Sequence, residues 1–152
     1  GNICRSPMAE AVLRHHVDSA GLPVVVDSAG TGGWHAGEPA HPNTMKMLEL
    51  HGYSLQHSAK QIETEWFSAR DLVLVMDQQN HNAVLRLAGK SHANKVRMYR
   101  SFDPQLSHLD SLDEELNVPD PYYGTLDDYQ NVLTMIESAT TGLVSYLKDT
   151  LQ

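Results

Sequence analysis

Residues 1–7, Gly-Asn-Ile-Cys-Arg-Ser-Pro, decide the fold because they form a loop that leads into a helix. Ser6 followed by Pro7 is typical of a helix N-cap and a first helical position. Apolar residues then recur at helical spacing as far as Gly21, which predicts a helix over 7–20. The free N–H groups and the dipole of a helix N-terminus favour an anion. Arg5 adds a guanidinium that can bind two phosphoryl oxygens, although a plain turn beside a surface arginine is the alternative.

Short apolar runs alternate with helical segments along the rest of the chain. The run at 24–26 leads into Asp27-Ser28-Ala29-Gly30 and predicts a buried strand, and 72–76 and 95–98 predict two more. Residues 43–51 and 78–88 have helical character. Apolar residues recur every three or four positions from 126 to 151, which predicts a long C-terminal helix. Strands that alternate with helices indicate parallel pairing in an α/β domain.

Composition excludes several classes of function. The chain has 152 residues, with 11 Lys and Arg against 19 Asp and Glu, for a net charge of −8. One domain fits this length. The acidic balance argues against binding to nucleic acid or to anionic membranes, so any phosphate must be bound by a small local group of residues. There is no apolar stretch of about 20 residues and no signal-peptide pattern. The single cysteine fits a reducing compartment, and we therefore expect a cytoplasmic protein.

The first ten residues resemble the signature of the low-molecular-weight protein tyrosine phosphatases, Cys-x-Gly-Asn-Ile-Cys-Arg-Ser. Further blocks resemble that family in the same order: Asp27-Ser28-Ala29-Gly30-Thr31, Gly33-Trp34-His35, Gly37-Glu38-Pro39, His57-Ser58-Ala59-Lys60-Gln61, Met76-Asp77-Gln78-Gln79-Asn80 and Asp120-Pro121-Tyr122-Tyr123-Gly124. The resemblance implies one domain over residues 1–152, with three layers and a central four-stranded parallel sheet flanked by helices. It also implies a phosphate-binding loop formed by Gly1, Asn2, Ile3, Cys4, Arg5 and Ser6.

The family's nucleophilic cysteine stands six residues before the arginine, which places it two positions ahead of Gly1. We expect that this sequence, which lacks an initiator methionine, starts after that cysteine and after the first strand. A pseudo-phosphatase that binds phosphate without turnover is the alternative. Cys4 matches the family's second loop cysteine, which resembles a resolving thiol, and a small buried apolar residue is the other interpretation.

Asp-Pro occurs twice, and the resemblance distinguishes the two copies. Asp120 matches the family's general acid because Tyr122-Tyr123-Gly124 follow it. Asp103 has no such sequel, and we expect it to form a turn.

The remaining site residues are also implied by the resemblance. Trp34, Tyr122 and Tyr123 would line an aromatic slot for a phenyl ring, unless they are core residues. Ile3 goes with phosphotyrosine, since related arginine phosphatases have threonine there. Four residues match polar positions that, in the family, support the loop and stabilise the thiolate: Asn2, Ser6, Ser28 and His57. Asp77 and Asn80 are expected at a helix start.

The implied reaction forms a phosphocysteine and then hydrolyses it, with Arg5 holding the phosphate and Asp120 moving the proton. No cofactor and no metal site are expected, because the histidines show no metal-ligand pattern. The implied partners are phosphotyrosine proteins and inorganic phosphate or other oxyanions. Arsenate reductase on the same fold is a rival, but its loop usually reads Cys-Arg-Ser-Gln, whereas Pro7 follows Ser6 here, and it needs further cysteines.

Overall fold

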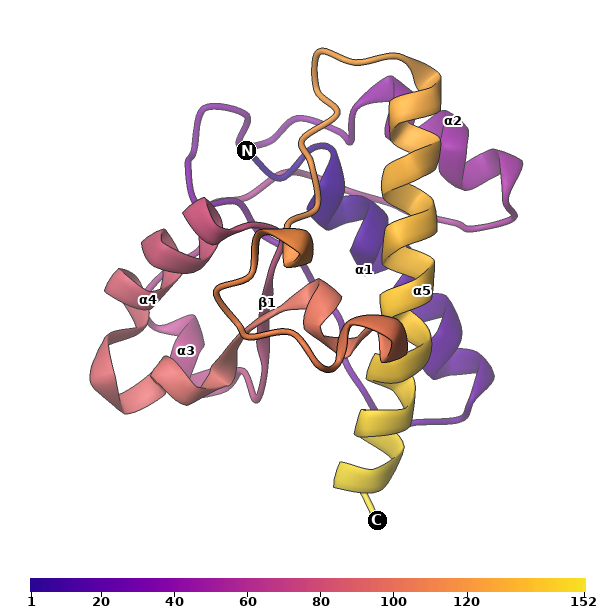
Figure 1. The fold of residues 1–152 in the computed structure, drawn as a ribbon. Coiled ribbons are helices and arrows are strands. Elements are labelled where there is room, and N and C mark those ends of the chain that lie inside the picture. The colour runs from indigo at the N-terminus through magenta and orange to yellow at the C-terminus, as the bar shows by residue number, and fades with distance from the viewer.

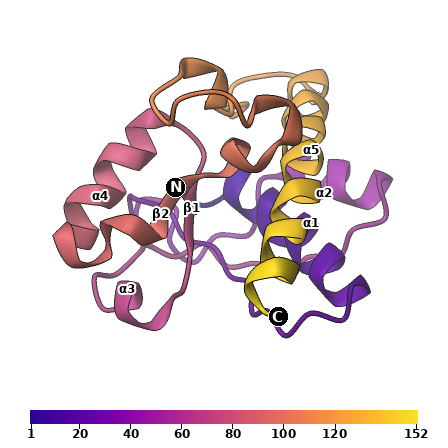
Figure 2. The same cartoon turned by 60° about the horizontal axis from the view of Figure 1, so that its bottom comes forward.

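The computed structural model describes residues 1–152 and has helices on both sides of a small sheet (Figure 1). The order is α1 (Arg5–Ser19), α2 (Pro42–Leu50), α3 (Trp66–Ala69), β1 (Val73–Val75), α4 (Gln78–His92), β2 (Val96–Met98) and α5 (Leu126–Thr150). Short 3₁₀ turns are η1 (Ala93–Lys95), η2 (Tyr99–Phe102), η3 (Pro104–Leu106) and η4 (Glu114–Leu116). Helices α3 and α4 lie on one side of β1, and α1, α2 and α5 lie on the other (Figures 1 and 2).

The sheet consists of β1 and β2, which pair in parallel, with Val73 opposite Val96 and Val75 opposite Met98. Helix α4 makes the crossover between them, as parallel strands require. Gly30 and Gln61 add one isolated parallel bridge. The predicted α/β class with parallel pairing is therefore confirmed. Of the four strands, the first of which was expected ahead of this sequence, the sheet contains two, because the segment at 24–26 does not pair.

The prediction of a buried strand at 24–26 was wrong, because this segment neither pairs with a strand nor is fully buried. The segment forms no ladder, and Val25 is 98% exposed. The Val26 carbonyl accepts a hydrogen bond from the Arg14 side chain at 2.6 Å, and no strand pairs with the segment. A cleft lined by this segment and by the residues of β1 separates the two.

Helix α1 starts earlier than predicted. It begins at Arg5, its N-cap is Cys4, and no side chain caps it. Ser6 is inside the helix rather than at the N-cap, and its hydroxyl accepts a hydrogen bond from Asn2 Nδ2 at 2.8 Å. Residues 7–13 are all buried, so α1 is packed on most of its circumference.

The other predicted elements are confirmed within a few residues. Helix α4 runs past residue 88 to His92, with a kink at Gly89, whose φ is 69°. Thr125 and Asp128 form a capping box at the start of α5. No helix of the structure combines the length and the apolar character needed to cross a bilayer.

The larger hydrophobic cluster joins α1 to α5. Met8, Val12 and Val17 of α1 pack in it together with buried side chains of α5, including Leu133 and Ile136. Each fully buried side chain of this size contributes about 1.5–3 kcal/mol to stability. A second cluster lies between α4 and the sheet. Because α5 fixes α1, it also fixes the loop that precedes α1.

We predict that Gly142→Ala destabilises the protein by about 1–3 kcal/mol through overpacking. Glycine to alanine inside a helix ordinarily stabilises by about 1 kcal/mol. Here an added Cβ would meet the carbonyl oxygen of Phe102, where η2 crosses α5. Urea unfolding measures the change, with the exposed neighbour Thr141→Ala as control. A stabilised Gly142→Ala variant would contradict this packing.

Candidate active site

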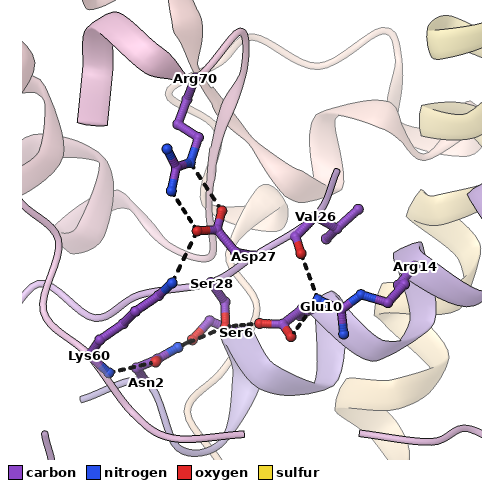
Figure 3. Close-up of polar contacts among 9 residues, drawn as sticks. All are labelled: Asn2, Ser6, Glu10, Arg14, Val26, Asp27, Ser28, Lys60 and Arg70. Carbon is purple, nitrogen blue, oxygen red and sulfur yellow. Dashed lines mark hydrogen bonds and ion pairs between the residues drawn. The ribbon is translucent and has the colours of Figure 1, made fainter. Parts of the chain in front are cut away.

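Asn2 is the centre of the loop at the start of α1. Its φ is 67°, in the left-handed region that residues other than glycine rarely adopt. Its Nδ2 donates to Ser6 Oγ at 2.8 Å and to Ser28 Oγ at 3.0 Å, and its Oδ1 accepts from the Lys60 backbone N–H at 3.1 Å (Figure 3). His57 Nε2 donates to the Asn2 carbonyl oxygen at 2.6 Å. Segments distant in the sequence therefore fix the loop conformation together.

Gly30 allows the chain to pass directly beneath this loop. An added Cβ at Gly30 would lie 2.9 Å from the backbone nitrogen of Asn2. The Gly30 N–H donates to the Lys60 carbonyl at 2.8 Å, and its own carbonyl accepts from the Ile62 N–H at 2.9 Å. The backbone contact that places Ser28 against Asn2 thus requires glycine at position 30.

The guanidinium of Arg5 is held at the first residue of α1. Its Nη1 donates to Asp77 Oδ2 at 2.7 Å and to the Val118 carbonyl at 2.7 Å, and its side chain is 14% exposed. Asp77 also caps α4, because its Oδ1 accepts the Asn80 N–H at 2.7 Å. The predicted helix-start role of Asp77 is confirmed, whereas its contact with Arg5 was missed. Nε and Nη2 of Arg5 donate to no protein acceptor, so both can bind an oxyanion.

Cys4 is buried beneath the loop, and its Sγ lies 3.4 Å from Tyr129 Oη. Burial raises the pKa of the Cys4 thiol, and the hydrogen bond with Tyr129 lowers it only in part. The thiol is therefore protonated at neutral pH, whereas nucleophilic cysteines react as thiolates.

The two Asp-Pro sequences lie in different surroundings. Asp120 is exposed and lines the same cleft, of about 1190 Å³, as Arg5, and its Oδ1 accepts the Tyr122 N–H at 3.1 Å. Asp103 is buried, and its Oδ1 accepts the Gln105 N–H at 2.9 Å at the start of η3. The turn predicted for Asp103 is confirmed.

Exposed aromatic rings stand at the edge of the cleft. Trp34 is 74% exposed and Tyr123 is 96% exposed, so neither is a core residue. The Tyr122 and Tyr123 rings meet edge to face, with centroids 4.7 Å apart. His35 lies between Trp34 and Tyr122, at 6.5 and 5.8 Å from their ring centroids. His35 lines the cleft, which was not predicted, because in the sequence it was noted only as part of the block Gly33-Trp34-His35.

A cluster of charges around Asp27 supports the loop from outside. Arg70 donates to the Asp27 carboxylate from Nη2 at 2.6 Å and from Nε at 3.1 Å, and Lys60 Nζ donates at 3.1 Å (Figure 3). Both cations also lie over the Trp66 ring, at 5.3 and 5.0 Å from its centroid. Burial alone would raise the pKa of Asp27, but the donors outweigh it and hold that pKa below its usual value.

No group of three or more His, Cys, Asp or Glu side chains is arranged to hold a metal ion. The chemical resources of the site are therefore the N-terminus of α1, the guanidinium of Arg5, the carboxylate of Asp120 and the aromatic rings. A loop at a helix N-terminus in an α/β fold, with a fixed arginine beside it, is typical of enzymes that bind phosphoryl groups.

Comparison with known proteins identifies the family. The sequence profile of the low molecular weight phosphotyrosine protein phosphatase family matches residues 1–152. A low molecular weight protein-tyrosine-phosphatase of Streptomyces coelicolor is 49% identical over 155 residues, covering 100% of this chain and 92% of the relative. The low molecular weight protein-tyrosine phosphatase A of Mycobacterium tuberculosis is 44% identical over 153 residues, covering 99% and 89%. The chain belongs to the low-molecular-weight phosphotyrosine protein phosphatases.

Solved structures agree with this fold. A protein tyrosine phosphatase of Entamoeba histolytica, with Hepes in its active site, has a TM-score of 0.89 and 28% identity, covering 100% of this chain and 94% of the other. A Drosophila arginine phosphatase has a TM-score of 0.85 and 25% identity, covering 96% and 92%. Because both substrate classes share the fold, the choice between tyrosine and arginine depends on the site residues.

We predict that Asp27→Asn lowers stability at neutral pH by up to about 1 kcal/mol, as for other partly exposed ion pairs. A carboxyl group whose pKa is lower in the folded than in the unfolded state stabilises the fold above the unfolded value of about 3.9. That contribution disappears as the pH falls through the folded pKa. The wild type should therefore lose more stability than Asp27→Asn on acidification.

Urea unfolding at a series of pH values between about 7 and 3 measures this difference. Asp18→Asn is the control, because Asp18 is exposed and forms no ion pair. Parallel pH curves for the wild type and Asp27→Asn would contradict the prediction.

Proposed function

We propose that the whole protein hydrolyses phosphotyrosine in proteins through a phosphocysteine intermediate, with Arg5 holding the phosphoryl group and Asp120 transferring the proton. The observation that carries this proposal is the fixed guanidinium of Arg5 at the N-terminus of α1, in one cleft with Asp120. Two guanidinium nitrogens and the N–H groups of the loop over residues 1–6 can bind the phosphoryl oxygens. Inorganic phosphate and other oxyanions would bind in the same loop.

The first step transfers the phosphoryl group to sulfur. A thiolate at the position two residues ahead of Gly1, where the family has its nucleophile, attacks phosphorus while the bond from phosphorus to the phenol oxygen breaks. Asp120 gives its proton to the departing phenolate oxygen. Cys4 does not supply the thiolate in this proposal, because its thiol is buried and its pKa is raised.

The second step returns the enzyme to its starting state. The Asp120 carboxylate takes a proton from a water molecule, whose oxygen attacks phosphorus, and the bond from sulfur to phosphorus breaks. Inorganic phosphate and the thiolate are the products. In both steps the N–H groups and Arg5 stabilise the charge on the equatorial oxygens.

The specificity proposed for tyrosine follows from the edge of the cleft. Trp34 and Tyr123 expose aromatic rings there, and Tyr122 lines the cleft while half-buried against the core, so the three rings can pack against a phenyl ring. The short side chain of phosphoserine would not carry its phosphate past these rings to the loop. The family resemblance of the loop sequence associates Ile3 with tyrosine rather than arginine substrates, which adds to this preference.

We predict that Asp120→Ala lowers kcat of the full-length protein on phenyl phosphate by about 100-fold or more, the usual contribution of general acid catalysis. The loss should be smaller for aryl phosphates with more acidic phenols, because their leaving groups need less protonation. Asp110→Ala is the matched control, since Asp110 is exposed and accepts the N–H of Leu112, two residues on, as Asp120 accepts that of Tyr122. Equal rates for wild type and Asp120→Ala would remove Asp120 from the mechanism. A wild type that binds phosphate without turnover would instead identify a pseudo-phosphatase.

We predict that Arg5→Lys weakens inhibition by vanadate about tenfold or more, because an ammonium group cannot bind two oxygens in the fixed plane of a guanidinium. The inhibition constant for vanadate, measured with an aryl phosphate substrate, tests this. The control is Arg86→Lys, since Arg86 is exposed on α4 and outside the cleft. An unaltered inhibition constant in Arg5→Lys would contradict the role proposed for Arg5.

A further inference from the structure

Glu10 of α1 is a buried carboxylate directly behind the loop, with 8% of its surface exposed. Its Oε1 accepts a hydrogen bond from Ser28 Oγ at 2.6 Å, and its Oε2 accepts one from Arg14 Nη2 at 2.8 Å (Figure 3). A buried charge is costly unless it is paired and hydrogen-bonded, and both conditions are met here. The reaction proposed above makes no direct use of Glu10.

The hydrogen bonds around Ser28 have only one possible direction. A serine hydroxyl has a single hydrogen, and Ser28 donates it to the carboxylate of Glu10, which can only accept. The Ser28 oxygen must therefore accept from Asn2 Nδ2, at 3.0 Å. The second hydrogen of that amide goes to Ser6 Oγ. The Glu10 carboxylate thus makes Ser28 an acceptor for the Asn2 amide, whose Oδ1 is bound on its other side by the Lys60 N–H.

Arg14 connects the same carboxylate to the segment that carries Ser28. Its Nη2 donates both to Glu10 Oε2 and to the Val26 carbonyl, at 2.8 and 2.6 Å. Glu10 and Arg14 are one helical turn apart, so one face of α1 holds the carboxylate, its counter-charge and the segment. Arg14 therefore holds the Glu10 carboxylate and the Val26 carbonyl on the same side of α1.

We propose that Glu10, paired with Arg14, is a positioning residue of the phosphate-binding loop. It sets the hydrogen-bond direction from Asn2 through Ser28, which keeps Asn2 in its left-handed conformation and the loop N–H groups directed at the phosphoryl oxygens. This inference rests on the proposed function, because it assumes that the loop binds phosphate.

The two neighbours require a group that only accepts hydrogen bonds, and not any polar group. Both neighbours of the Glu10 carboxylate, Ser28 Oγ and Arg14 Nη2, are donors. The amide of Glu10→Gln has one acceptor oxygen and one donor nitrogen, so it places a donor against one of them. Removing the donor of Arg14 in the same protein lets the amide oxygen face Ser28 again. The proposal therefore predicts that a second substitution rescues the first.

The test uses the full-length protein and measures the affinity for vanadate and kcat/KM on an aryl phosphate. We expect Glu10→Gln to weaken vanadate binding about tenfold, comparable to the loss of one hydrogen bond to a charged group, and to lower kcat/KM similarly. The double variant Glu10→Gln/Arg14→Met should recover most of the vanadate affinity. A role in stability alone would not predict this recovery of anion binding.

Glu137→Gln is a matched control on α5. Its carboxylate also accepts a hydroxyl, from Tyr53 at 2.6 Å, and it lies outside the cleft. We expect Glu137→Gln to change the melting temperature without changing the vanadate affinity. If Glu10→Gln does not fold, Ser28→Ala interrupts the same connection and should weaken vanadate binding by a similar factor.

The outcomes separate the two proposals. Vanadate affinity within twofold of the wild type in Glu10→Gln, or in Ser28→Ala where Glu10→Gln does not fold, overturns the inference and leaves the proposed function intact. No recovery of affinity in Glu10→Gln/Arg14→Met also overturns the inference. A wild-type protein that neither binds vanadate nor hydrolyses aryl phosphates overturns the proposed function, and the inference with it.

Discussion

The left-handed backbone of Asn2 is the constraint on which the rest of the site depends. A residue other than glycine adopts this conformation only at a cost, so neighbouring groups must stabilise it. Ser6, Ser28, His57 and Lys60 do so, and they come from α1, from the segment before Gly30 and from the segment before Gln61. The sheet has only two strands, and one isolated bridge lies outside it. These side-chain hydrogen bonds therefore help to hold the three segments in place relative to one another.

The net charge of −8 and an anion-binding loop are compatible because the carboxylates around the loop are individually paired. Asp77 is bound by Arg5, Glu10 by Arg14, and Asp27 by Arg70 and Lys60. Asp120 differs, since its carboxylate accepts only a backbone N–H and stays exposed. The proton transfer proposed for Asp120 therefore falls on a carboxylate that lines the cleft and makes no ion pair.

Sequence reasoning succeeded where the determinants are local and failed where they are distant. Apolar periodicity predicted α5, and short apolar runs predicted the two paired strands. The cap at Asp77 could be predicted because its partner, Asn80, is three residues away. The contact between Arg5 and Asp77 joins positions 72 apart, and no local pattern indicates it. Ser6 was misassigned as an N-cap because α1 begins one residue earlier, and its hydroxyl binds Asn2 instead. The segment 24–26 has the composition of a strand, but it has no ladder partner, and composition does not report partners.

Helix α1 shows why a buried polar residue carries more information than its place in an amphipathic pattern. Ser6, Glu10 and Arg14 recur every four residues and form one stripe, which ordinary patterning would assign to solvent. The structure places this stripe against Asn2, Val26 and Ser28, while the apolar positions of the same helix pack on α5. The helix therefore has an apolar interface that contributes stability and a polar interface that orients the loop. Because α1 is a single rigid element, the packing on α5 and the conformation of Asn2 are mechanically coupled. Core substitutions in α5, apart from Tyr129, which contacts Cys4 of the loop directly, should thus affect anion binding only as far as they displace α1.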